Sequence, residues 1–244
     1  MCRFLKARSS ATYTELADHF AVSEMTMRRD VGLLAATGQV VIVPRGVQTA
    51  KGFLAELPFL ERIQRMGKEK DLIGKAAASQ VTEGSSVVLD SGTTTLQVAH
   101  HLRGKRCTVI TISLSALLEL ADSPTVRIEM IGGVYRSSSQ DLVGSQVYEG
   151  LSALRADRVI FGAAAVSRDG EVMVNDPEAA PGLVRAGRQR ILVVDSSKIG
   201  ADALYRFCEL AQCDLMITDE GANEADLEQL RKHVKVLVAR TGEV

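Results

Sequence analysis

The stretch AVSEMTMRRDVGLL, residues 21–34, places two adjacent arginines on a segment that also carries an apolar stripe. Ser23 stands just before the stripe, and serine is a preferred helix N-cap because its hydroxyl accepts a hydrogen bond from a free amide of the first turn. On a helix with about 100° between residues, the apolar and polar side chains fall on opposite faces. The inward face holds Met27, Val31 and Leu34, and the outward face holds Met25, Arg28, Arg29 and Gly32.

The neighbouring segments predict a helix-turn-helix followed by a β-ribbon. Residues 4–37 have helical character, and Thr14 is placed to cap TELADHF, whose Leu16, Ala17 and Phe20 share one face. The three residues AVS then join the two helices, which is the turn length of a helix-turn-helix. After Gly38, the runs QVVIV and VQT flank PRG and predict a small wing.

In a helix-turn-helix, the second helix enters the major groove of DNA with its first residues in contact with bases and phosphates. We therefore expect Arg28 and Arg29 to contact phosphates or guanine, while Met25 offers an apolar contact and Ser23 and Thr26 offer hydroxyls. Two alternatives remain open at this point. The arginines can form a solvated basic face, and Thr26 can bond to the backbone near the cap.

Composition is that of an ordinary soluble globular protein, with 244 residues, 46% hydrophobic and 24% charged, and a net charge of -1. No apolar run reaches the roughly 20 residues of a membrane span, and the N-terminus lacks a signal-peptide core, so we expect a cytoplasmic protein.

The four cysteines are scattered and form no metal motif with the histidines, so we expect buried or inert thiols and no cofactor. Residues 1–50 carry a balance of +2 and the remainder -3, which permits a DNA-binding N-terminus.

A second part begins at residue 68. Short apolar runs alternate there with helical ones, which is typical of an α/β domain with a mostly parallel sheet covered on both faces. The predicted helices are 71–81, 94–102 and 115–121, and the predicted strands are 85–90, 107–112, 126–133, 157–166, 190–195 and 213–219. Between the two parts, residues 51–67 show no clean periodicity. We predict a DNA-binding domain at 1–50, a linker at 51–67 and a ligand-binding domain at 68–244.

The segment VVLDSGTTTLQVAHHL, residues 87–102, predicts an anion site. A buried strand ends at Asp90, and Ser91 and Gly92 turn the chain into a helix that begins with the hydroxyls of Thr93, Thr94 and Thr95. Glycine lets the backbone approach a ligand, and the free amides at a helix start attract phosphate. No GxxxxGK[ST] or GxGxxG motif accompanies it, which disfavours ATP and NAD. The alternative is a simple strand-to-helix turn.

On these residues the chain resembles the DeoR family of bacterial transcription regulators. VSEMTMRRDV at 22–31 corresponds to the family pattern VSxxTIRRDL. The resemblance continues through the second part in Glu69 and Lys70, DSGTTT at 90–95, Gly132 and Gly133, Gly144, Asp157 followed by FG, and DSSKIG at 195–200. It implies a winged helix-turn-helix followed by a sensor domain that resembles ribose-5-phosphate isomerase and binds phosphorylated sugars.

The resemblance also assigns effector contacts. Ser91 to Thr95 would hold the phosphate, Lys70 would add a positive charge, and Asp195 and Lys198 would lie near the sugar. Asp90 and Gly133 would belong to the same set, and Glu178 would be an acid that faces the ligand. Lys198 has an equal alternative as an exposed lysine in a turn.

The chain departs from the family pattern at three places. The wing reads GQVVIVPRG, with Ile42, Pro44 and Arg45 at the positions of arginine, histidine and glycine, and Arg45 can restore a phosphate contact. Only Met1 to Ala7 remain to form the first helix, so we expect it to be shortened. In the second part, Pro181 and Gly182 fall where the family has a continuous helix, so we expect that helix to be broken.

The resemblance to an isomerase raises the alternative of an enzyme. Isomerisation of sugar phosphates needs a carboxylate base, but Ala163, Ala164 and Ala165 occupy the corresponding segment. We therefore predict a regulator without enzymatic activity, a repressor of carbohydrate genes that binds double-stranded operator DNA as a dimer or tetramer. A phosphorylated sugar or related metabolite would release it. The alternatives are a sugar-phosphate isomerase-like enzyme with an accessory domain and a protein that has lost DNA binding.

Overall fold

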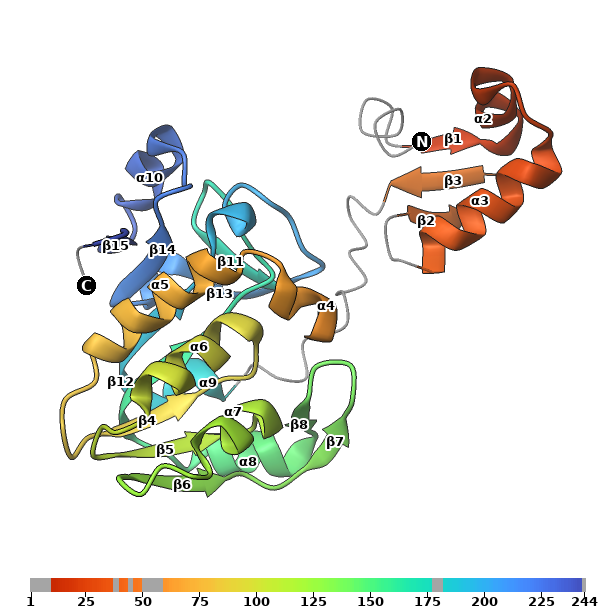
Figure 1. The fold of residues 1–244 in the computed structure, drawn as a ribbon. Helices are drawn as coiled ribbons and strands as arrows, with labels where there is room; N and C mark the ends of the chain where they lie inside the picture. The colour runs from red at the N-terminus through yellow and green to blue at the C-terminus, as the bar shows by residue number, and fades with distance from the viewer. Residues whose placement is uncertain (1–9, 37–39, 44–45, 50–58, 177–181, 243–244) are drawn as a thin grey trace. The chain divides into compact units, whose positions relative to one another are not determined.

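The computed structural model describes residues 10–36, 40–43, 46–49, 59–176 and 182–242. The chain divides into two compact units, the first formed by residues 1–57 and 202–204 and the second by residues 58–201 and 205–244 (Figure 1). Among the described residues, the first unit has one hydrophobic core and the second has two.

The first unit is a winged helix-turn-helix, as the sequence predicts. Its elements are β1 (Ser10–Thr12), α2 (Tyr13–Phe20), α3 (Glu24–Ala36), β2 (Val40–Val43) and β3 (Gly46–Thr49). The strands form an antiparallel sheet in the order β1-β3-β2, and β2 pairs with β3 as the predicted wing. Strand β1 lies where the sequence predicted helix. Its backbone pairs with β3, and this tertiary pairing decides the conformation of so short a segment.

The start of α2 differs from its prediction. Thr12, not Thr14, is the N-cap, because Thr12 and Glu15 form a reciprocal capping box in which each side chain binds the backbone amide of the other. The hydroxyl of Thr14 instead donates to Glu24 Oε1 at 2.6 Å, which ties the start of α2 to the start of α3. Leu16 is buried as predicted, but Phe20, in the last turn, is exposed.

The second unit is built on a seven-stranded, all-parallel sheet, which confirms the predicted fold class. Its order is β15-β14-β12-β9-β4-β5-β6. The strands are β4 (Ser86–Leu89), β5 (Cys107–Thr111), β6 (Val126–Met130), β9 (Ala156–Phe161), β12 (Gly187–Val193), β14 (Leu215–Asp219) and β15 (Val236–Ala239). Each predicted strand is present, and β15 was not predicted.

Strand order reverses between β4 and β9. The chain proceeds from β4 outward through β5 to β6, then returns to β9 on the other side of β4 and continues outward to β15. In open α/β sheets, ligands bind beyond the carboxyl ends of the strands at such a reversal point. The loops that begin at Asp90 and Gly162 lie there.

Helices cover both faces of this sheet. One core packs α5 (Gly67–Ser79), α6 (Thr93–Leu102) and α7 (Leu114–Leu120) against one face. The other core packs α8 (Ser145–Ser152), α9 (Leu183–Ala186) and α10 (Glu224–Leu230) against the opposite face. Successive residues of β4 point to alternate faces, with Val87 and Leu89 in the first core and Val88 in the second. Helix α9 begins after Gly182 and is only four residues long, in agreement with the predicted break.

Two smaller sheets complete the unit and were not predicted. Strands β10 (Ala165–Val166), β11 (Glu171–Val174) and β13 (Tyr205–Glu209) form one, and β7 (Val134–Arg136) and β8 (Asp141–Val143) form a hairpin. The predicted strand at 157–166 is therefore wrong in its length, because the chain leaves the parallel sheet after β9 and joins the antiparallel sheet at β10.

Helix α4 (Phe59–Gln64) occupies part of the segment for which the sequence indicated only a linker. Phe59 is buried, and its amide donates to the carbonyl of Ser138 at 3.0 Å, in the turn of the β7–β8 hairpin. The sequence did not predict this helix, because its six residues are stabilised by one buried aromatic side chain and one tertiary hydrogen bond.

No helix in the described part of the chain is long and apolar enough to cross a bilayer. The three cysteines within it, Cys107, Cys208 and Cys213, are buried and free, which confirms the prediction of buried thiols, and Cys2 lies outside the described residues.

Candidate functional sites

Ser23 begins α3, as predicted. Its Oγ accepts the amide of Thr26 at 3.2 Å, and the two hydroxyl oxygens are 2.9 Å apart. The Thr26 hydroxyl thus lies at the cap, bonded to the side chain of Ser23, whereas the alternative interpretation expected a bond to the backbone. One amide of the first turn, that of Thr26, is thus satisfied by the residue that precedes the helix.

The turn before Ser23 fixes how α3 follows α2. Ala21 adopts the left-handed conformation, with φ 52° and ψ 44°. The amide of Val22 donates to the carbonyl of Ala17 at 3.0 Å, and that of Ala21 to Asp18 at 3.3 Å. This is the hydrogen-bond pattern of a Schellman motif, in which glycine is the usual left-handed residue.

The α3 residues that we predict to contact DNA lie on its outward face. Met25 is 82% exposed and both arginines are exposed, whereas Met27 and Val31 are buried in the small core. The guanidinium of Arg28 lies 4.2 Å from the centroid of the Tyr13 ring, a contact that the sequence did not predict. Stacking on an aromatic face restricts the arginine before it meets a partner. Arg45 lies outside the described residues, so its phosphate contact stays a prediction.

In the second unit, the loop after β4 leads directly into α6. Gly92 has φ 145° and no side chain to cap the helix, and a Cβ there would lie 3.3 Å from Thr95 Oγ1. Thr95 donates its hydroxyl to the carbonyl of Gly92 at 3.0 Å. Thr93 and Thr94 are buried at the same helix start. The first amides of α6 therefore remain available, and an anion is attracted to that end of the helix dipole.

Asp90 and Ser91 are held by neighbouring loops. Asp90 is buried, and its Oδ2 accepts the amide of Gly162 at 3.4 Å, which joins the loops after β4 and β9. Ser91 Oγ donates to Asp141 Oδ2 at 2.9 Å. The predicted loop residues thus meet at the reversal point of the sheet.

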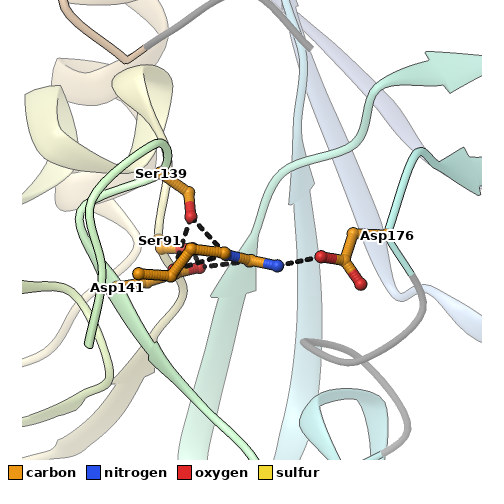
Figure 2. Close-up of polar contacts among 5 residues, drawn as sticks. Ser91, Ser139, Asp141 and Asp176 are labelled. Carbon is orange, nitrogen blue, oxygen red and sulfur yellow. Dashed lines mark hydrogen bonds and ion pairs between the residues drawn. The ribbon is translucent and has the colours of Figure 1, made fainter. Parts of the chain in front are cut away.

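Arg136 and Asp141 extend this network, and Figure 2 labels Asp141 with its neighbours Ser91 and Ser139. Arg136 and Asp141 face each other across the hairpin, and Arg136 binds Asp141 through Nε at 3.1 Å and Nη2 at 2.9 Å. Ser139 donates to the same carboxylate at 2.5 Å, and Arg136 Nη1 binds Asp176. Sequence reasoning missed Arg136, Asp141 and Asp176, since no local pattern distinguishes them from surface charges.

Lys70 lies between α4 and the loop after β12. Its Nζ donates to the carbonyls of Arg62 and Arg65, each at 2.6 Å. Burial lowers the pKa of Lys70 to about 8, the carboxylate of Asp195 opposes that shift, and the charges of Lys198, Arg62 and Arg65 reinforce it. The charges of Asp195 and Lys198 therefore act on Lys70, whose ammonium group is hydrogen-bonded to backbone carbonyls in and just after α4.

Three further residues are predicted to contact the effector, namely Asp195, Gly133 and Glu178. Asp195 is buried and caps a 3-10 turn, η2 (Ser196–Lys198), by accepting the amide of Ser197 at 3.2 Å. A Cβ on Gly133 would lie 2.8 Å from the carbonyl oxygen of Val143, so glycine is needed there for close packing of the hairpin. Glu178 lies outside the described residues.

Both units match known families. Residues 1–46 match the DeoR-like helix-turn-helix domain, and residues 65–220 match the DeoR C terminal sensor domain. The chain belongs to the DeoR family. It is thus a DNA-binding transcription regulator that joins a winged helix-turn-helix to a sensor domain.

Relatives of this DeoR-family chain match over nearly their whole lengths. HTH-type transcriptional repressor GlcR of Bacillus subtilis is 30% identical, with 98% of this chain and 94% of that protein covered. The lactose phosphotransferase system repressor of Staphylococcus epidermidis is 29% identical, with 96% and 95% covered. The glycerol-3-phosphate regulon repressor of Escherichia coli is 27% identical, with 94% and 92% covered.

Proposed function

We propose that this DeoR-family regulator is a cytoplasmic repressor of carbohydrate metabolism genes and that a phosphorylated sugar or related metabolite releases it from its operator. The uncapped start of α6 at the reversal point of the parallel sheet is the observation that carries the ligand class. Free amides, buried hydroxyls and the positive end of a helix dipole favour a phosphate. All three relatives are named as repressors, and the names of two of them, which refer to lactose and to glycerol 3-phosphate, support the class of regulated genes.

At DNA, α3 would lie in the major groove. Arg28 and Arg29 would contact phosphates or guanine, and Ser23, Met25 and Thr26 would lie beside the bases at the helix start. A symmetric dimer or tetramer would place two such helices on repeated half-sites. The effector would change the arrangement of these helices, by a coupling free energy of typically about 1–3 kcal/mol.

The first experiment is a mobility shift with the full chain and the DNA upstream of its own gene. We expect affinity to fall roughly a hundredfold between about 50 and 200 mM salt because arginines displace counterions from phosphates. Arg28→Ala combined with Arg29→Ala should lose at least about 2 kcal/mol of binding. The matched control is Arg106→Ala combined with Arg127→Ala, which removes the same charge from two exposed positions of the second unit. Equal affinity of the two double variants would reject the role of α3.

The second experiment is a thermal-shift screen of sugar phosphates and the corresponding free sugars. A ligand that binds only the native protein raises its melting temperature. We expect the phosphates to raise it and the free sugars to have no effect. Equal shifts from both would reject the phosphate site at α6.

The enzyme alternative is tested in the same samples. Residues 163–165 after β9 are alanines, and the nearby Glu171 forms an ion pair with Arg206 at 3.1 Å. We expect no interconversion of ribose 5-phosphate and ribulose 5-phosphate. Steady turnover by the purified chain would overturn the assignment as a sensor.

A further inference from the structure

The guanidinium of Arg136 joins the loop at the start of α6 to Asp176, which follows β11. Its inner side, Nε and Nη2, binds Asp141, and its outer nitrogen Nη1 binds Asp176. Ser91 Oγ and Arg136 Nη2 both donate to Oδ2 of Asp141, each at 2.9 Å. Arg136 is therefore linked to Ser91, in the candidate phosphate loop, through a single oxygen of Asp141, which Figure 2 labels.

The two carboxylates differ in how firmly they hold the arginine. The side chain of Asp141 is 1% exposed, and both of its oxygens accept hydrogen bonds from Arg136, one also from Ser139 and the other from Ser91. The side chain of Asp176 is 37% exposed and accepts one nitrogen of Arg136, Nη1. Ion pairs with partly exposed carboxylates contribute little free energy, so the bond from Nη1 to Asp176 is the exchangeable one.

Charge explains why a ligand would use this nitrogen. A phosphoryl group at the start of α6 would lie beside the buried carboxylate of Asp141, to which Ser91 donates. Two like charges at such close range repel strongly in surroundings of low dielectric constant unless a cation lies between them. Arg136 is the cation in contact with that carboxylate, and the guanidinium geometry suits phosphate oxygens.

We propose that Arg136 is an effector-binding residue that donates Nη1 to a phosphoryl oxygen of a phosphate monoester held at the start of α6, and that Asp176 competes with the ligand for this nitrogen. The inference rests on the proposed function, since it names a further contact at the same sensor site. Arg136 adds affinity for the phosphate, and Asp176 sets how much of that affinity is realised.

The test uses the full chain titrated with ribose 5-phosphate, glucose 6-phosphate, fructose 6-phosphate and inorganic phosphate, followed by calorimetry and thermal shift. For whichever compound binds the unmodified protein, Arg136→Gln should weaken binding at least about tenfold, as expected for the loss of a charged hydrogen bond. Arg136→Lys should retain part of the affinity, because it keeps the charge but loses the planar donor pair. Asp176→Asn should tighten binding up to about fivefold by removing the competing charge.

The matched control is Arg103→Gln, which breaks an exposed ion pair with Glu119 at the other end of α6 and should leave binding unchanged. If Arg136 only holds the hairpin in place, Asp176→Asn will not tighten binding, and this outcome would reject the competition even where Arg136→Gln fails to fold. Unchanged binding by a folded Arg136→Gln protein would reject the contact itself. Absence of binding by the unmodified protein to every phosphate would reject the proposed effector class and, with it, this inference.

Discussion

Helices α3 and α6 both begin where the protein is expected to meet phosphate, but they begin differently. The Ser23 hydroxyl binds one amide at the start of α3, that of Thr26, whereas Gly92 has no side chain to bind the first amides of α6. The difference separates two ways of binding an anion. At DNA, α3 offers long side chains that reach across a groove, and at the sensor site α6 offers the main chain to a small group that approaches it closely.

The largest expected effect comes from closing the open helix start. Gly92→Ala should weaken phosphate binding at least about tenfold because alanine is strained at φ 145° and would turn the amides of Thr93 and Thr94 away from the ligand. Calorimetric titration with the phosphate that binds the unmodified protein measures the loss. Gly104→Ala is the control, since Gly104 has φ 81° and open space around its Cβ position. It should cost a similar strain energy and keep binding, and equal losses in both variants would contradict the prediction.

A change of pH should separate the two sites next. A phosphate monoester has a second pKa of about 6, so binding to α6 should weaken severalfold between about pH 7.5 and about pH 5.5 as the dianion takes up a proton. DNA phosphodiesters and the arginines of α3 keep their charges over this range, and operator affinity should change less. Parallel titrations and mobility shifts at each pH provide the measurement. A larger change at the operator would show that the comparison is wrong.

Removing the cap from α3 should have a smaller, local effect. Ser23→Ala should destabilise the first turn by about 1 kcal/mol, seen as faster amide hydrogen exchange at Met25 and Thr26. Ser152→Ala is the matched substitution at the opposite end of a helix, the exposed last residue of α8, and should leave exchange in that helix unchanged or slower. Unaltered exchange at the start of α3 would indicate that other contacts hold this turn.

The smallest expected effect is a gain in stability. Ala21→Gly should stabilise the junction of α2 and α3 by about 0.5–1 kcal/mol because glycine adopts the left-handed conformation without strain. Slower hydrogen exchange in α2 measures the gain. Ala153→Gly, at the end of α8 where the backbone is right-handed, should give no gain. A loss of stability in Ala21→Gly would mean that the greater freedom of the unfolded chain outweighs the relieved strain.

Sequence was most informative where the deciding interactions are local. Ser23, Met27 and Val31 follow from capping and helical spacing, and the loop from Asp90 to Thr95 follows from a strand end, a glycine and a hydroxyl run. The cap of α2 was within reach in the same way, since Thr12 and Glu15 have the spacing of a capping box. Thr14, two residues later, has the same side chain, and the prediction that it caps α2 is wrong.

Contacts between distant segments account for what the sequence left out. Ser91 and Asp141 are 50 positions apart, and Arg136 and Asp176 are 40 apart. A single sequence shows that such residues are polar but not that a hairpin beyond β6 brings them together. Lys70 illustrates the same limit in part, because its neighbourhood with Asp195 was expected whereas its bonds to α4 depended on a helix that the sequence did not reveal.

Helix α4 is fastened at both ends to the segments that surround the sensor site. At its first residue, Phe59 binds the hairpin turn that also carries Ser139, and its last turn is held through carbonyls that Lys70 binds. The hairpin and Lys70 therefore hold the two ends of this short helix, and we expect a displacement of either one to tilt α4.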